Sequence, residues 1–251
     1  MLILLPPSEG KTEPPSGPAL DLDGLSSPRL APTRCRILDA LVRVCEGNAT
    51  RASKRLGLGP TQLEELSRNA ALRTAPTARA DSIYTGVLYG AWDPASLSKA
   101  GRAFADEHVA TASALFGVVR AGDRIPAYRL SAGVELPRLG PVAALWRRPL
   151  GPVLDELTDG ELLVDLRSGA YVSLHNPTGD LARRTATIRV ISEVDGIRKV
   201  VSHFNKATKG QIVRALCENR VEASSPAQLG DALRDLGWKV ELEGQRLDVV
   251  I

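Results

Sequence analysis

The stretch MLILLPPSEGKT, residues 1 to 12, begins with a short apolar run that two prolines end. Leu2 to Leu5 are apolar on both faces, which is typical of a strand in the middle of a sheet rather than at its edge. Ser8, Glu9 and Lys11 follow directly, and open α/β sheets build their sites beyond the carboxyl ends of their strands. We therefore expect a central strand that delivers a hydroxyl, a carboxylate and an ammonium group to one place.

The same stretch is not a phosphate-binding P-loop. That motif requires a glycine six residues before the lysine, and Leu5 stands there. Pro6 and Pro7 also remove two of the backbone N–H donors that would cradle a phosphate. Ser8, Glu9 and Lys11 remain candidates for acid/base catalysis or anion binding. The alternative is an ordinary solvated loop with an incidental Glu–Lys pair.

Composition limits the class of protein. The 251 residues suffice for one large domain, and we expect a single domain over residues 1–251. A net charge of +3 permits nucleic-acid binding without demanding it. Three cysteines without close spacing favour a reducing cytoplasm over a disulfide framework or a zinc site. No stretch approaches about 18 apolar residues, so a cytoplasmic location is expected.

Periodicity predicts a mixed-sheet α/β fold with α+β character. A proline- and glycine-rich stretch over residues 13–32 predicts a long surface loop. Helices are predicted over residues 33–72 with a break at LGLGP, and over residues 98–115, 142–157, 208–219 and 226–236. Strands are predicted over residues 2–5, 162–166, 170–174, 185–193, 198–205, 238–242 and 247–251.

Several motifs together resemble the YaaA family, the peroxide stress protein group of bacteria. The matching segments are MLILLPPSEGKT, YTGVLYGAW (84–92), LFGVVRAGDRIPAYRLSAGVEL (115–136), VDLRSGAY (164–171), VVSHFNKATKG (200–210) and ENRV (218–221). Many members read SPAKT and FYAKKARG where this chain has PPSEGKT and HFNKATKG, which looks like an actinobacterial-type branch. The resemblance implies a compact cytosolic protein that limits damage by hydrogen peroxide and is linked to lowered free iron. It also implies a helix-hairpin-helix element, a positively charged cleft and DNA binding.

The candidate helix-hairpin-helix lies within residues 48–70. Such an element offers backbone N–H groups to a phosphate at a glycine-containing hairpin, and Gly57 and Gly59 in LGLGP fit that pattern. Glu64 and Glu65 would repel phosphate if they faced it. The alternative is a plain glycine turn between two helices.

A second basic cluster is SHFNKATKGQIVRAL. Lys206 and Lys209 fall in the first turn of the predicted helix, where the helix dipole disfavours cations. An anionic ligand would explain them, and Gly210 would let it approach closely. Solvated lysines that point outward are the alternative.

A third group combines arginine with tyrosine or serine. Tyr128 and Arg129 lie in an extended stretch, and Arg167 and Ser168 lie at a glycine turn after a predicted strand. Arginine offers a fork for phosphate or carboxylate, and tyrosine a stacking face. A pair between Arg167 and Asp165, or between Arg129 and Glu135, would instead be a purely structural salt bridge.

Two functions follow as hypotheses. The first is DNA binding through backbone contacts in a basic cleft, without sequence specificity. The second is an enzyme acting on a small anionic, nucleotide- or nucleobase-like substrate. The candidate catalytic residues are Ser8, Glu9 and Lys11. The candidate DNA- or anion-binding residues are Lys11, Gly57, Gly59, Tyr128, Arg129, Arg167, Ser168, Asn205, Lys206 and Lys209. The scattered histidines show no ligand spacing, so neither a metal nor a cofactor is expected.

Overall fold

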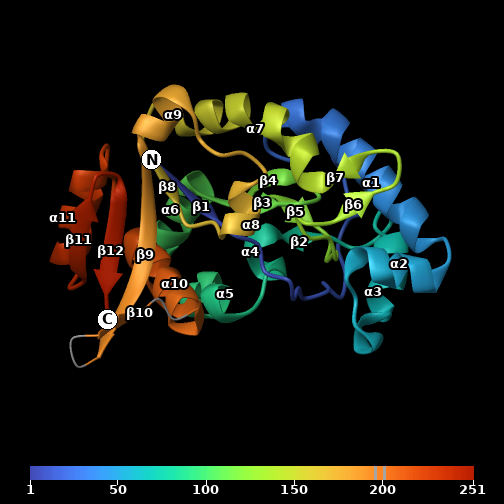
Figure 1. The fold of residues 1–251 in the computed structure, drawn as a ribbon, viewed down its shortest axis with the longest axis horizontal. Helices are drawn as coiled ribbons and strands as arrows, with labels where there is room; N and C mark the ends of the chain where they lie inside the picture. The colour runs from blue at the N-terminus through green and yellow to red at the C-terminus, as the bar shows by residue number, and fades with distance from the viewer. Residues whose placement is uncertain (195–196, 200–201) are drawn as a thin grey trace.

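A computed structural model describes residues 1–194, 197–199 and 202–251, and an eight-stranded mixed sheet runs through it (Figure 1). The order along the sheet is β11 (Lys239–Glu243), β12 (Arg246–Val250), β9 (Thr185–Val194), β8 (Leu163–Asp165), β1 (Leu2–Leu5), β3 (Val109–Ser113) and β4 (Gly117–Arg120). β10 (Ile197–Lys199) pairs with β9 in a hairpin. The five strands from β12 to β3 are parallel, and β11, β4 and β10 are antiparallel to their partners.

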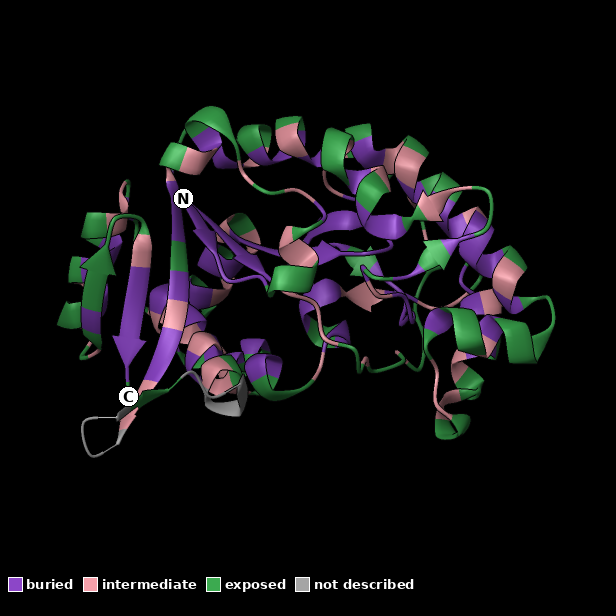
Figure 2. Cartoon of the chain, viewed as in Figure 1, coloured by how far each residue is buried: buried purple, intermediate pink, exposed green. Residues whose placement is uncertain are grey.

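The opening strand is buried at the centre of this sheet, as predicted. Ile3 of β1 lies opposite Val109 on one side and Val164 on the other. All four residues of β1 are at most 1% exposed. Figure 2 shows the same pattern across the central strands, which are buried almost throughout. A strand that is apolar on both faces is stable only when helices cover both faces of the sheet. β1 is covered in this way.

Helices cover the two faces of the sheet. α1 (Ala31–Cys45) and α7 (Val142–Thr158) lie above it in Figure 1, and α5 (Val87–Trp92) and α10 (Ser202–Glu218) lie below. α10 also packs on α6 (Lys99–His108), and α11 (Pro226–Asp235) packs on β11. No helix of the described residues is long and apolar enough to cross a membrane.

Shorter elements complete the chain. They are η1 (Pro28–Leu30), α2 (Ala49–Leu56), η2 (Pro60–Gln62), α3 (Glu64–Ala70), α4 (Ala80–Ile83), η3 (Pro94–Ser96), α8 (Gly169–Val172) and α9 (Gly179–Arg183). Two small ladders pair β2 (Ala78–Arg79) with β5 (Arg124–Ile125) and β6 (Glu135–Leu136) with β7 (Gly140–Pro141).

Four predicted elements differ from the structure, and one of them is the helix predicted over residues 208–219, which begins at Ser202 and so leaves Lys206 and Lys209 beyond its first turn. The helix predicted over residues 98–115 ends at His108, and β3 follows it at once. The strand predicted over residues 170–174 is instead the helical turn α8. The strand predicted over residues 198–205 ends at Lys199, α10 begins at Ser202, and residues 200 and 201 lie outside the described part of the chain. Short apolar runs do not distinguish a buried strand from a helix by periodicity alone.

Gly210 has a packing role rather than the ligand-facing role expected for it. A Cβ atom at this position would lie 2.2 Å from the carbonyl oxygen of Leu88 and 2.8 Å from the Cβ of Ala91. Both contacts belong to α5, so the missing side chain lets the backbones of α10 and α5 approach closely. This packing sets the position of α10, which carries Lys209.

Candidate active site

The order of the strands marks one place for a site. From β1 the chain passes to β3 on one side, and it later returns to β8 on the other. In open α/β sheets ligands bind outside the carboxyl ends of the strands at such a reversal. Ser113 ends β3, Asp165 ends β8, and Lys11 follows β1. The residues that carry chemistry are therefore found where the topology predicts a crevice.

Lys11 lies at the centre of this cluster. Its Nζ donates to the carbonyl oxygens of Ser8, at 2.8 Å, and Glu9, at 3.3 Å. The same nitrogen lies 4.3 Å from the centre of the Tyr128 ring and 5.4 Å from that of Tyr84. Burial, with a further contribution from the charge of Arg129, lowers the pKa of Lys11 from 10.5 to about 7. In a large fraction of the protein molecules, Lys11 is therefore an uncharged amine near neutral pH.

Two of the four tyrosines of the chain, Tyr84 and Tyr128, lie near Lys11, and Tyr89 and Tyr171 lie close to these two. The hydroxyl of Tyr128 lies 3.0 Å from that of Tyr84 and 2.7 Å from Oγ of Ser113. The Tyr89 ring stacks on Tyr84 with 5.3 Å between ring centres. The charges of Glu9 and Arg129 act on Tyr171, and burial raises the pKa of its phenol to about 12. Burial raises the pKa values of the other three as well, so all four phenols stay neutral.

Arg129 brings a positive charge to the same place. Asn69 of α3 fixes its backbone, because the Asn69 side chain accepts from the Arg129 N–H at 2.9 Å and donates to its carbonyl at 2.8 Å. The guanidinium lies 3.1 Å from a carboxylate oxygen of Glu9. The Arg129 side chain is 11% exposed and the Glu9 side chain 77% exposed. Glu9 thus covers a mostly buried arginine from the solvent side.

Arg167 has the structural role that the alternative interpretation gave it. Its Nε and a terminal nitrogen donate to the two carboxylate oxygens of Asp165, at 2.9 and 2.7 Å. The other terminal nitrogen donates to the carbonyls of His175, at 3.0 Å, and Tyr171, at 3.3 Å. Most of its donors are therefore used within the protein, and little of its guanidinium remains for a ligand.

Lys209 reaches the same strand end from α10. Its Nζ donates to the carbonyl oxygen of Leu166 at 3.2 Å. Burial lowers its pKa, and the nearby charge of Asp165 opposes that shift. Lys209 thus lies beside the Asp165–Arg167 pair, whereas Lys206 lies exposed on α10.

The other candidate residues lie at the edge of the cluster or away from it. Ser8 holds the loop, because its Oγ donates to the carbonyl of Gly10 at 2.6 Å and accepts from the N–H of Thr85 at 2.9 Å. Ser168 is exposed at the start of α8 and makes no side-chain capping bond there. Among the described residues the buried Oδ1 of Asn205 has no hydrogen-bond partner.

The hairpin glycines use their N–H groups within the hairpin. Gly57 adopts a left-handed backbone conformation with φ of 66°, and its N–H donates to the carbonyl oxygen of Lys54 at 3.3 Å. The N–H of Gly59 donates to the side-chain oxygen of Gln62 at 3.0 Å. A phosphate at this turn would have to displace these acceptors.

Sequence reasoning missed several residues of the site. Glu65, treated as a repulsive charge on the hairpin, instead faces the charges of Lys11 and Arg129, which oppose the rise that burial causes in its pKa. Tyr84 was visible only as part of the YTGVLYGAW segment. No sequence signal indicated Asn69, which is fully buried and holds Arg129 from 60 residues away.

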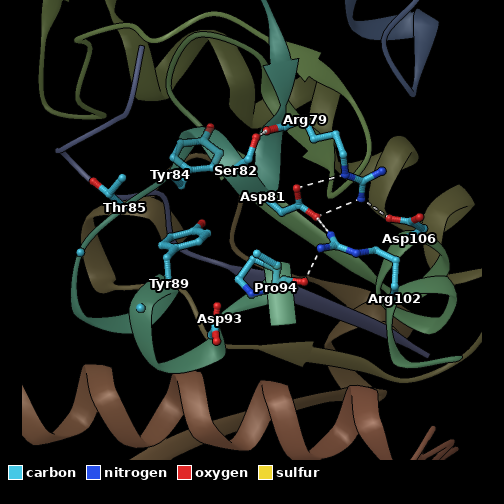
Figure 3. A pocket seen from close by; sticks show the side chains of 13 residues that line it. Arg79, Asp81, Ser82, Tyr84, Thr85, Tyr89, Asp93, Pro94, Arg102 and Asp106 are labelled. Carbon is cyan, nitrogen blue, oxygen red and sulfur yellow. Dashed lines mark hydrogen bonds and ion pairs between the residues drawn. The ribbon is translucent and has the colours of Figure 1, made fainter. Parts of the chain in front are cut away.

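A cavity of about 660 Å³ adjoins the cluster (Figure 3). Tyr84 and Tyr89 form one side of it, and Arg79, Asp81, Arg102 and Asp106 form the other. The buried Asp81 pairs with Arg79 at 2.9 Å and with Arg102, and Arg79 also pairs with Asp106. The arginines of this cavity are therefore neutralised. Among the described residues no group of three histidine, cysteine or acidic side chains could hold a metal ion.

Comparison with known proteins gives a consistent result over the whole length. A family model described as peroxide stress protein YaaA matches residues 1–243. A UPF0246 protein of Streptomyces coelicolor is 48% identical over 97% of this chain and 93% of its own length. A UPF0246 protein of Corynebacterium efficiens is 41% identical over 98% and 97%. An uncharacterized protein of Campylobacter jejuni is 28% identical over 72% and 70%.

Proposed function

This chain belongs to the peroxide stress protein YaaA family, and on that premise we propose that it is an enzyme in which Lys11 is the reactive amine. The substrate is a small anionic molecule of the nucleotide or nucleobase class. The observation that carries the proposal is the burial of Lys11 against the rings of Tyr84 and Tyr128, close enough to Arg129 for that charge to act on it. A lysine that is desolvated next to another cation is an activated nucleophile or base.

The other residues of the cluster have roles that fit this chemistry. Arg129 binds the anionic group of the substrate, because an arginine fork suits carboxylate and phosphate. Glu9 and Glu65 are the acidic residues whose charges act on Lys11, and Glu65 also pairs with Arg68 at 2.6 Å; we assign proton exchange with Lys11 to these two carboxylates. Tyr171, which is only partly buried and lies close enough to Glu9 and Arg129 for their charges to act on it, offers a ring face to a ligand there.

The proposal predicts that ligand binding depends on Arg129. A panel of nucleotides, nucleosides and nucleobases is screened by thermal shift, and hits are titrated by calorimetry. We expect Arg129→Gln to weaken an anionic hit about 10- to 100-fold, because a charge-assisted hydrogen bond contributes roughly 1.5–3 kcal/mol. The matched control is Arg183→Gln, whose side chain is 74% exposed and paired only on its own helix turn. Equal affinities of both variants for every hit would refute the role of Arg129.

DNA binding is the second candidate, and one surface supports it. Residues 31–56, which span α1 and α2, contain two acidic and six basic residues, and all the basic ones except the buried Arg34 are exposed. Arg36, Arg43 and Arg138 line a groove of about 470 Å³ between α1 and the loop that follows β6. Because the N–H groups of the hairpin have internal acceptors, we assign the phosphate contacts to these side chains rather than to Gly57 and Gly59.

The DNA-binding proposal predicts a steep dependence on salt. Each phosphate contact releases a counterion, so the slope of log K against log salt changes by about 0.9 for each contact. Removing Arg36 and Arg43 together, as glutamines, is therefore expected to reduce the slope by about 2. The measurement is fluorescence anisotropy of a labelled duplex at several salt concentrations, with Arg183→Gln as the control. A flat salt response of the wild-type protein would contradict this candidate.

A further inference from the structure

The buried arginines of this chain differ in how many of their donors are used. Arg34 donates to the carbonyls of Ser26, Phe116 and Val118 at 2.8–2.9 Å. Arg167 makes the four bonds described above. The Arg129 side chain, by contrast, has a single recorded partner among the described residues, the carboxylate of Glu9. Among the described residues, Arg34 leaves one buried terminal nitrogen without a partner, whereas Arg129 keeps donors for a ligand beside the exposed Glu9.

The contact between Glu9 and Arg129 resembles the one that a ligand would make. Glu9 is a solvent-exposed side chain on the loop after β1, so its ion pair is weak and easily displaced. An incoming carboxylate or phosphate would bind the same guanidinium with the same geometry. The Glu9 carboxylate thus marks the place of an anionic group on the ligand.

Lys11 lies beside this anion position and supplies a nucleophile. Its ammonium contacts two backbone carbonyls and the face of Tyr128. None of these contacts is an ion pair that would hold the charged form. As a whole residue Lys11 is intermediate in exposure, but its ammonium end is largely buried, so a ligand would reach the amine by displacing the exposed Glu9 side chain. A free amine next to a bound anion suits a substrate that carries a carbonyl carbon and an anionic group.

We propose that Lys11 forms an imine with the carbonyl carbon of an anionic aldehyde or ketone whose carboxylate or phosphate binds Arg129 in place of Glu9. This inference rests on the proposed function and narrows its substrate to an anionic carbonyl compound. The open-chain aldehyde of a pentose phosphate, the sugar part of a nucleotide, belongs to that class.

The covalent step balances without any oxidant or reductant. The lone pair of Nζ attacks the carbonyl carbon, and one proton passes from the nitrogen to the carbonyl oxygen to give a carbinolamine. The one hydrogen left on the nitrogen then leaves as a proton together with the hydroxyl, so that amine plus carbonyl gives imine plus water. We assign the transfer of this proton to Glu65 and the displaced Glu9, the acidic residues whose charges act on Lys11.

The test is reductive trapping of the full-length wild-type protein. The protein is incubated near pH 7 with cyanoborohydride and one of three probes, glyoxylate, ribose 5-phosphate or the uncharged glycolaldehyde. Adducts are located by peptide mass spectrometry. We expect at least one anionic probe to label Lys11 about 10-fold faster than Lys99, an exposed lysine of α6 that serves as the internal reference. Preference for glyoxylate or for ribose 5-phosphate identifies the anion as carboxylate or phosphate.

Two variants distinguish the role of Arg129, which binds the anionic group, from that of Lys11, the nucleophile. Arg129→Gln is expected to slow labelling of Lys11 by the anionic probes about 10-fold more than labelling by glycolaldehyde, because glycolaldehyde loses only the effect of the Arg129 charge on the pKa of Lys11. Lys11→Met is expected to lose the fast adduct and keep the slow ones. If no anionic probe labels Lys11 of the wild-type protein faster than Lys99, the inference is overturned. Binding of a nucleotide in the ligand screen would then leave the proposed function in place with a non-covalent role for Lys11.

Discussion

Replacing Arg167 by methionine is expected to lower the free energy of unfolding by about 3–5 kcal/mol. The Arg167 and Asp165 side chains are 1% and 5% exposed. Without the guanidinium, Asp165 becomes a buried charge with no cation bonded to it, and the carbonyls of Tyr171 and His175 lose a donor. Breaking a buried pair from one side costs far more than the pair itself contributes, because the remaining charge stays desolvated.

The measurement is urea unfolding, followed by tryptophan fluorescence, with Arg129→Met as the matched comparison. In that variant the exposed Glu9 remains solvated, so the free energy of unfolding should fall by about 1 kcal/mol or less. A double variant, Asp165→Asn with Arg167→Met, should recover much of the stability because no buried charge remains. Equal losses in the two single variants would contradict the division into a structural and a ligand-binding arginine.

Replacing Lys11 by methionine is expected to stabilise the folded protein at and below neutral pH. The pKa of Lys11 falls from 10.5 to about 7 on folding, which corresponds to at most about 5 kcal/mol. Below pH 7 the side chain is protonated in both states, and burial of the charge destabilises the fold in full. Between the two pKa values the unfolded chain binds one proton more, so wild-type stability rises with pH. Methionine, similar in size and uncharged, avoids this cost, and the lost bonds to Ser8 and Glu9 offset part of the gain.

Unfolding free energies of wild type and Lys11→Met should therefore differ most near pH 6 and converge towards pH 10. The difference between the two proteins at each pH removes the contributions of other titrating groups. Lys99→Met, at an exposed position, should show no such trend. A difference between wild type and Lys11→Met that does not change with pH would show that Lys11 is not a desolvated amine, and the proposed chemistry would lose its basis.

Parts of the fold with strong local patterns were predictable. β1 is an apolar run stopped by two prolines, β9 and β12 are rich in β-branched residues, and α7 and α11 follow the helical period closely, so each lies within a few residues of its predicted range. β3 was missed because its residues are all buried and show no alternation, so the run continued the preceding helical pattern. Its strand conformation depends on pairing with β1, which lies about a hundred residues earlier in the sequence.

The site, like the fold, has parts that local sequence patterns predict and parts that depend on contacts between distant segments. The polar loop after β1 was predictable, because a strand stopped by two prolines must release its next residues at one edge of a sheet. The sequence also offered several cations as equal candidates. The sequence held no information on which of these cations would pair with a carboxylate, because Glu9 and Arg129 are 120 residues apart. Asn69, which bonds to the backbone of Arg129, is 60 residues away from it.

The sequence by itself determined the central buried strand, the mixed α/β architecture and the identity of the polar residues that follow the strand, because apolar runs, prolines and helical periods act over a few neighbouring residues. Only the tertiary structure decided that Lys11 is desolvated, that Arg129 keeps free donors and that Arg167 does not. Desolvation and charge pairing depend on which distant segments pack around a side chain, and that is a property of the folded chain alone.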